Sequence, residues 1–327
     1  MISPAKFDEA ELVTLIDRLV RSAPGLHGGS ATVRQITQKQ EKYRGGYDAV
    51  VSSVIPFYVQ AKTASFYPEN SRSDIIRIRN DLGVNCSPGA FAFPLRRHDG
   101  TDEPLQHNAL FWLSLRSMAG YVCPTFVSES TLERRLNEAL TVQRHQIWTY
   151  DDLNYFEQGG VSVNKIRTKH FRGLITIIPH RLVDNYKHRY SYTNELSPDV
   201  VFHSEPEKVK GVYNFGKFIE EFFLDSSDFS YNQKKISIFS VDEIRDQQLK
   251  WIEEALENKA EGVRITPADA SLALATAGIS SVARFQRPNS VLSFLKKMDW
   301  MDVAAFYGGL LKEKYSIRQI LIMNNVP

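Results

Sequence analysis

The sequence is poor in cysteine. Its 327 residues include only Cys86 and Cys123, and the two are not in CxxC spacing. Disulfide scaffolds and zinc knuckles need several cysteines at characteristic intervals, so both classes are excluded. We expect the two thiols to be small buried side chains.

Long apolar runs are also missing. No uninterrupted stretch approaches the ~20 residues that a membrane-spanning helix needs. The first residues, MISPAKFDEAEL, carry acids where a secretory signal has a basic region and then an apolar one. These two features predict a cytoplasmic protein without a membrane partner.

Neither sign of charge is in excess. The 40 Lys and Arg residues nearly balance the 38 Asp and Glu residues, giving a net charge of +2 and a pI near 8.4. This balance neither requires nor excludes nucleic-acid binding, because a local basic groove can exist on a near-neutral protein. P-loop, Rossmann, HExxH and EF-hand motifs are absent. No internal repeat indicates a solenoid.

The composition is that of a folded protein with a sizeable core, since 43% of the residues are hydrophobic. The length suggests two domains, or one domain with additions. The pattern predicts an N-terminal α/β domain over 1–145 and a helical C-terminal region over 241–327. Between them, 146–240 contains strand-like runs that either extend the first sheet or form a separate one.

The prediction of a functional site rests on residues 47–66, YDAVVSSVIPFYVQAKTASF. This stretch reads as two strands, 47–51 and 54–64, joined by a turn at Ser52 and Ser53. Such a hairpin could bring Asp48 beside the second strand. Because side chains alternate along a strand, that strand has two faces, one with Tyr58, Gln60 and Lys62 and the other with Phe57, Val59 and Ala61.

An acid, an amide oxygen and a lysine at one sheet edge suit phosphodiester chemistry. The Asp48 carboxylate, the Gln60 amide oxygen and the Ala61 carbonyl are the oxygen ligands that Mg²⁺ prefers. Lys62 could polarise a water molecule or stabilise the charge that develops on a phosphate. The pattern therefore predicts a metal-dependent phosphodiesterase site.

At these residues the chain resembles the PD-(D/E)xK nuclease superfamily, in particular its Mrr-like restriction endonuclease branch. That superfamily combines a helical glutamate, a strand aspartate and a (D/E)xK or QxK strand, which correspond here to Glu41, Asp48, and Gln60 with Lys62 in VQAK. A helix-like segment, 106–118, and the strand-like YVCPTF follow in the order that the superfamily shows. Two departures are Gln60, which removes a charge from the metal site, and the short interval between Glu41 and Asp48.

The resemblance implies a mixed sheet flanked by helices and an endonuclease that uses Mg²⁺ or Mn²⁺. Glu41, Asp48, Gln60 and Ala61 would hold the metal, with Lys62 as the catalytic lysine. It further implies a restriction or phage-defence role, nucleic acid as the partner with DNA preferred over RNA, and a protein partner or a homo-oligomer. The alternative is a noncatalytic nucleic-acid-binding or assembly subunit that keeps the fold. A plainer interpretation of the motif itself is an ordinary strand in which Lys62 reaches solvent and Gln60 bonds an edge backbone.

The helix pattern supplies further expectations. Leu12, Leu15, Ile16 and Leu19 mark an amphipathic helix over 7–20 with acids in its first turn, and a polar helix is expected over 31–43. Thr266 and Pro267 begin another helix. The stretch 290–311 reads as helical, divided near Asp299 and ending around Gly308 and Gly309.

Two charged groups have open interpretations. Five arginines close after the proposed site either position phosphates or are ordinary solvated charges: Arg72, Arg77, Arg79, Arg96 and Arg97. Three histidines recur among acids and could ligate zinc only if the fold gathers them. They are His180, His188 and His203, with Asp184 and Glu205 nearby.

Overall fold

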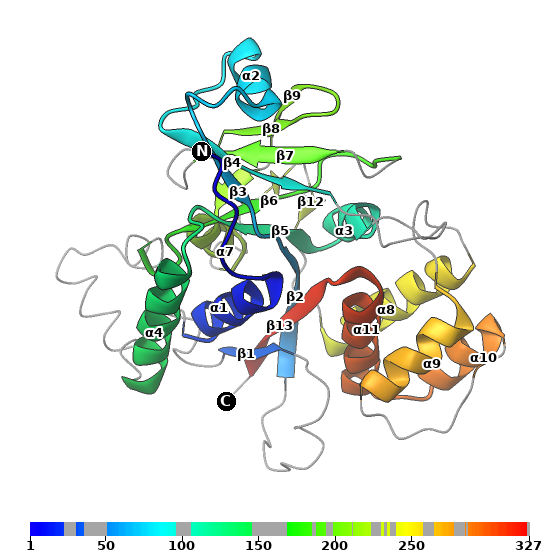
Figure 1. The fold of residues 1–327 in the computed structure, drawn as a ribbon. Helices are drawn as coiled ribbons and strands as arrows, with labels where there is room; N and C mark the ends of the chain where they lie inside the picture. The colour runs from blue at the N-terminus through cyan, green and yellow to red at the C-terminus, as the bar shows by residue number, and fades with distance from the viewer. Residues whose placement is uncertain are drawn as a thin grey trace. The chain divides into compact units, whose positions relative to one another are not determined.

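The computed structural model describes residues 1–22, 31–35, 51–95, 106–145, 169–184, 188–193, 199–210, 212–223, 230–231, 234–235, 240–257, 265–277, 285 and 287–325. The chain forms two compact units, each assembled from separated stretches. Unit 1 contains 1–29, 60–96 and 120–236, and unit 2 contains 30–59, 97–119 and 237–327. Both units therefore draw on residues 1–145, which is a different division from the three consecutive regions expected from the sequence. The coarse prediction of an α/β protein with sheets flanked by helices is confirmed (Figure 1).

Unit 1 is built mostly of antiparallel strands. Its helices are α1 (Glu9–Arg21), α2 (Asp74–Asp81), α4 (Glu129–His145) and α7 (Phe215–Phe223). Its strands are the end of β2 (Val51–Ala61), β3 (Ser65–Pro68), β4 (Gly89–Pro94), most of β5 (Met118–Pro124), β6 (Leu174–Ile177), β7 (Arg189–Tyr192), β8 (Val200–Phe202), β9 (Glu207–Val209), β10 (Val212–Asn214), β11 (Ser230–Tyr231) and β12 (Lys234–Lys235). β5 pairs with β6, β6 with β10, and β11 with β12, all antiparallel.

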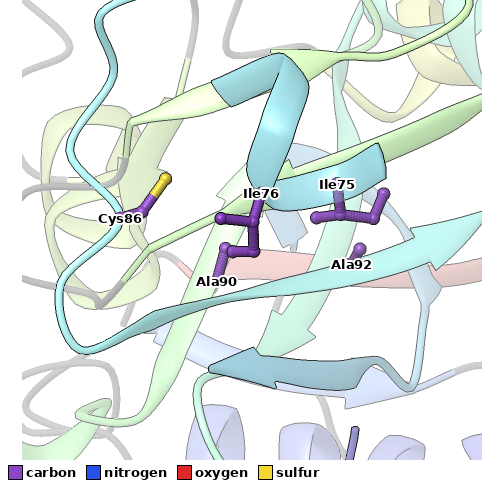
Figure 2. Packing of buried hydrophobic residues seen from close by; sticks show 5 residues of the cluster. All are labelled: Ile75, Ile76, Cys86, Ala90 and Ala92. Carbon is purple, nitrogen blue, oxygen red and sulfur yellow. The ribbon is translucent and has the colours of Figure 1, made fainter. Parts of the chain in front are cut away.

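A five-stranded antiparallel sheet in unit 1 runs in the order β3-β4-β7-β8-β9. Small and aromatic side chains alternate along β4 and β7, so the two faces of the sheet differ there. The small face is covered by α2, whose Ile75 and Ile76 pack on Ala90 and Ala92 with Cys86 at the side (Figure 2). The opposite face carries buried aromatic rings, among them Phe93, Tyr190, Tyr192 and Phe202.

The N-terminal helix confirms the amphipathic prediction. α1 begins after Asp8, whose carboxylate accepts a hydrogen bond from the Glu11 backbone N–H at 2.8 Å, while Glu11 reaches back to the Asp8 N–H at 2.9 Å. The four predicted core positions, Leu12, Leu15, Ile16 and Leu19, are buried. The apolar side of α1 packs against α4.

Unit 2 is helical around a short sheet. Its helices are α3 (Gln106–Ser114), α8 (Val241–Leu256), α9 (Pro267–Thr276), α10 (Pro288–Leu295) and α11 (Trp300–Tyr315). β13 (Arg318–Asn325) pairs antiparallel with β1 (Ala31–Gln35) and with β2. α11 packs on α8, α9 and β13. No helix in the described part of the chain is long and apolar enough to cross a bilayer.

The C-terminal helix signals are mostly confirmed. Thr266 caps α9 with Asp269 in a capping box, and Asp299 caps α11, which divides the helical stretch there. The prediction that the stretch ends at Gly308 and Gly309 is wrong, because α11 continues to Tyr315. The glycines instead allow close packing. A Cβ on Gly309 would lie 3.3 Å from the α9 backbone oxygen of Ala273.

Two local predictions in the N-terminal third are wrong. Residues 31–35 form strand β1 rather than the start of a helix, because β13, far away in sequence, supplies a pairing partner. Ser52 and Ser53 lie inside one continuous strand, β2, rather than in a turn. The register of β2 against β13 shifts next to Ser52, between Asn324 and Asn325, so a bulge accommodates the polar pair.

Candidate active site

The end of β2 buries the QxK segment. Gln60 has no exposed surface, Ala61 is 4% exposed and Lys62 is 3% exposed. The Lys62 backbone N–H donates to the Val122 carbonyl of β5 at 3.0 Å, which fixes the chain just beyond the strand. Gln60, Ala61 and Lys62 therefore lie on a rigid element of unit 1, as a site that positions reacting groups requires.

The Lys62 ammonium meets a carboxylate that the sequence analysis did not select. Lys62 Nζ lies 3.2 Å from Glu9 Oε1, within unit 1. Glu9 is the first residue of α1, where a negative charge is favoured by the helix dipole and by the free backbone N–H groups. The Glu9 side chain is 35% exposed, so the ion pair is buried at the lysine and open at the glutamate.

One sequence signal pointed toward Glu9. It stands in the first turn of the one N-terminal helix that was expected to pack on the sheet. An acid at that place projects from the helix end rather than from its apolar stripe. Its contact with Lys62 joins residues 53 positions apart. Local patterns carry no information about a pairing at that distance.

β5 carries two uncharged side chains close to the ion pair, Cys123 and Tyr121. Burial raises the pKa of the Cys123 thiol well above its usual value, with Lys62 opposing this shift and Glu9 adding to it. Burial likewise raises the pKa of Tyr121, helped by Tyr190, Cys123 and Glu9. Both side chains are therefore neutral, and the prediction that Cys123 is a small buried side chain is confirmed.

The other two expected site residues, Glu41 and Asp48, lie outside the described residues. The turn at Ser52 and Ser53 that was expected to bring Asp48 to Gln60 and Lys62 is absent, since both serines are in β2. The described part of the site thus consists of Gln60, Ala61 and Lys62, joined by Glu9.

Oxygen donors dominate this part of the site. The Glu9 carboxylate, the Gln60 amide and the Ala61 carbonyl match the ligand preference of Mg²⁺ or Mn²⁺ in kind. Glu9 is at the same time the partner of Lys62. The described residues contain no group of three or more His, Cys, Asp or Glu side chains placed to hold a metal. A full ligand set would need acids in addition to Glu9.

The histidines form pairs instead of a metal cluster. His180 contacts Glu207 through Nε2 and the Tyr190 hydroxyl through Nδ1, both at 2.9 Å. His188 Nε2 lies 3.3 Å from Asp184. The remaining pair joins His203 Nε2 to the Ser191 hydroxyl at 2.7 Å. Each histidine has its own acid or hydroxyl partner, and burial lowers the pKa of both His180 and His203.

The arginines after the proposed site differ in their exposure and in their partners. Arg77 is exposed and forms ion pairs with Asp74 and Asp81 on its own helix. Arg79 is fully buried, so it can neither position a phosphate nor act as a solvated charge. Arg96 and Arg97 lie outside the described residues.

Comparison with known proteins identifies no relative: no protein-family model, no curated protein and no solved structure matches this chain.

Proposed function

We propose that the chain is a metal-dependent nuclease that hydrolyses phosphodiester bonds and belongs to a bacterial restriction or phage-defence system. The proposal includes a PD-(D/E)xK-like arrangement of residues and a preference for DNA over RNA. The observation that carries it is the burial of Gln60 and Lys62 at the end of β2, with the Lys62 ammonium held 3.2 Å from the α1 carboxylate of Glu9.

Lys62 is the residue best placed to act on a phosphate. Its ammonium is shielded from water, where a charge interacts with a developing negative charge more strongly than it does in solution. Glu9 pairs with the ammonium at 3.2 Å and fixes its position. Removing Glu9 would leave a buried, uncompensated cation, which proteins avoid.

Gln60 and the Ala61 carbonyl would hold a divalent cation together with Asp48 and Glu41, with Glu9 as an additional acid. When bound, the cation supplies Lewis-acid activation of water and neutralises charge on the phosphate. The chain's own contribution is the placement of Lys62, the exclusion of water by β5, and the orientation of the Gln60 amide.

A second function, a noncatalytic nucleic-acid-binding or assembly subunit, has one observation in its favour. Lys62 already has a carboxylate partner, and Gln60 has no exposed surface. An ion pair that is complete in itself can be retained for packing alone after activity is lost.

The deciding experiment is cleavage of plasmid DNA, single-stranded DNA and RNA with Mg²⁺ or Mn²⁺. Wild type is compared with Lys62→Met, Asp48→Asn and, as a matched control, the exposed Lys208→Met in β9. We expect metal-dependent cutting of DNA that falls by about 100-fold or more in the first two variants, the usual loss for a group that stabilises transition-state charge. Lys208→Met should retain full activity.

Binding of nucleic acid without cutting by either metal would favour the noncatalytic subunit. Cutting that survives both Lys62→Met and Asp48→Asn would place the active site elsewhere. Circular dichroism of each variant shows whether a lost activity reflects lost chemistry or lost folding.

A further inference from the structure

Unit 2 contains a small cavity that residues of β2, α3, α8 and α11 help to line, away from the residues of the proposed nuclease site. The lining side chains that matter for its chemistry are Tyr58, Leu113, Arg116, Gln248, Trp251 and Tyr307. The space, counted up to where it opens to solvent, is about 250 Å³, and its enclosed part has room for about one water molecule. Drug-sized sites occupy ~300–1,000 Å³, so the cavity suits one small ring or water.

Two polar atoms of the lining are buried without a hydrogen-bond partner among the described residues. They are the amide oxygen Oε1 of Gln248 and the indole nitrogen Nε1 of Trp251. The two residues are only 2% and 3% exposed. Because they are three positions apart on α8, they are neighbours on one face of the helix. Native proteins pair almost all buried polar groups with protein, water or ligand atoms, so an unpaired acceptor and an unpaired donor at one cavity indicate a binding site.

The neighbours of Gln248 determine the orientation of its amide. The Ala304 carbonyl can only accept a hydrogen bond, so the Gln319 NH₂ group donates to it, at 3.1 Å. Gln319 Oε1 is then left to accept from the Gln248 NH₂ group, at 3.3 Å. Burial raises the pKa of the Tyr58 hydroxyl, and hydrogen bonds with Gln248 and Tyr307 oppose this rise, as donors to the tyrosine oxygen do. The NH₂ group of Gln248 therefore has protein partners, and its Oε1 is the atom available to a ligand.

Most of the cavity wall is apolar. The Tyr307 ring meets the rings of Tyr58 and Trp251 edge to face, with centroids 6.0 Å and 5.1 Å away. Arg116 is the one charged side chain among the described lining residues, and its guanidinium forms an ion pair with Glu254 at 2.7 Å. Aromatic walls and a charge that already has a partner favour a flat, neutral molecule over an ion.

We propose that this cavity binds a neutral planar ring whose edge carries an N–H group next to a carbonyl, the lactam edge of uracil. The ligand N–H donates to Gln248 Oε1, and the ligand carbonyl accepts from the Trp251 indole N–H. These two groups enter the enclosed part of the cavity, while the body of the ring lies against Tyr58, Leu113 and Tyr307. A water molecule also offers a donor and an acceptor, so occupancy by water alone is the competing outcome. The inference concerns unit 2 by itself and does not rest on the proposed nuclease activity.

The test follows the indole N–H signals of the full chain, labelled with ¹⁵N at its four tryptophans, by NMR. Trp251→Phe identifies the Trp251 signal. We expect uracil to shift this signal saturably, with a Kd of about 1 mM for so small a ligand. The matched control ligand, 1,3-dimethyluracil, has the same ring without an N–H group. It should bind at least about tenfold more weakly, because Gln248 Oε1 stays unpaired.

Thymidine, which carries the same edge on a sugar, distinguishes the source of the ring. Binding of thymidine as well as uracil would support the site and assign it to bases in nucleosides or nucleic acid. Binding of uracil without thymidine would support it as a site for free rings.

A pair of variants tests the role of Gln248. Gln248→Met removes the acceptor and keeps the length of the side chain, so uracil should bind at least about tenfold more weakly. Gln247→Met is the matched control at the next position of the lining and should stay within about threefold of wild type.

The proposal fails if the Trp251 signal does not shift at up to about 10 mM uracil, since an affinity near 1 mM would then give almost full occupancy. The cavity would in that case hold only water. Equal binding of uracil and 1,3-dimethyluracil would overturn the proposal, as would unchanged uracil binding by Gln248→Met. If Gln248→Met does not fold, the comparison of the two ligands on wild type decides.

Discussion

Two of the buried cations of unit 1, Lys62 and Arg79, are held in different ways. Lys62, at the end of β2, is 3% exposed and contacts the carboxylate of Glu9, which is 35% exposed. Arg79, under α2, is completely buried and donates only to a hydroxyl and two backbone carbonyls. The lysine has a counter-charge and lies behind a residue that solvent can reach. Among the described residues, no carboxylate forms an ion pair with the arginine, and its side chain has no exposed surface.

This difference indicates different roles. Lys62 is buried, but its carboxylate partner Glu9 is partly exposed. The ammonium can therefore exchange this partner for a phosphate or a water molecule during a reaction. A guanidinium that satisfies two loop carbonyls and a strand hydroxyl connects α2, its following loop and β7 into one structure. We therefore expect changes at Arg79 to act mainly on folding, and changes at Lys62 to act mainly on activity.

The largest expected effect on stability is that of Arg79→Ala. It removes the Arg79 hydrogen bonds to the buried Ser191 hydroxyl and to the backbone carbonyls of Asn85 and Asp199, and it opens a cavity under α2. The combined cost should be about 4 kcal/mol in the free energy of unfolding. Urea titration followed by circular dichroism measures it.

Arg77→Ala is the matched control on the same helix. Arg77 is 63% exposed and pairs only with Asp74 and Asp81 on the surface of α2. Its removal should cost less than about 0.5 kcal/mol. Equal losses in the two variants would contradict the structural role given to Arg79.

The contrast between these arginines also shows the limit of sequence reasoning. Both arginines were open to the same two interpretations, phosphate contacts or solvated charges, and their sequence neighbours do not distinguish them. Arg79 is buried because the turn after α2 and strands β7 and β8 provide acceptors that lie far along the chain. Composition and periodicity cannot indicate such partners.

Elements with strong local signals were predictable. The apolar stripe of α1 and the capped start of α9 at Thr266 and Pro267 appear where the residues indicated. Strand β1 and the uninterrupted β2 were missed, because β13 determines both by pairing with them from the other end of the chain. The QxK segment was recognisable in sequence, whereas Glu9 was not, since its contact with Lys62 is a tertiary one.

A second prediction concerns His203, which shares the Ser191 hydroxyl with Arg79. Burial, then the charges of Arg79 and Arg189, lower the pKa of His203 to about 4. The unfolded chain, with a histidine pKa near 6.5, therefore binds more protons between pH 6.5 and pH 4. Stability from this group is present above pH 6.5 and is lost as the pH falls toward 4.

Wild type should lose more free energy of unfolding than His203→Gln when the pH falls from 7 to 4. The difference between the two losses should be about 2 kcal/mol. Urea titrations of wild type and variant at several pH values measure the difference. His170→Gln is a second case and should also flatten the pH dependence. His170 also has a pKa lowered to about 4, mainly by burial, but its ring contacts the Leu19 carbonyl and Ser22 rather than Ser191. A His203→Gln difference that does not vary with pH would contradict the assignment.

The smallest expected effect tests the asymmetry of the Lys62 ion pair. Glu9→Gln leaves a buried ammonium without its counter-charge and should cost about 1.5 kcal/mol, moderated by the partial exposure of Glu9. Lys62→Met replaces the buried side chain with an apolar one of similar volume and frees a carboxylate that water can reach. It should stay within about 0.5 kcal/mol of wild type.

The double variant Glu9→Gln with Lys62→Met separates this explanation from a general sensitivity of α1. Without the Lys62 ammonium, removing the Glu9 charge no longer leaves a buried cation unpaired. The double variant should therefore be as stable as Lys62→Met alone. Asp17→Asn, which breaks the half-exposed pair of Asp17 with Arg21 on the same helix, should cost less than about 0.5 kcal/mol. Additive losses in the double variant would mean that Glu9 stabilises α1 by itself, through its place in the first turn. Lys62 would then be retained for a purpose other than pairing with it.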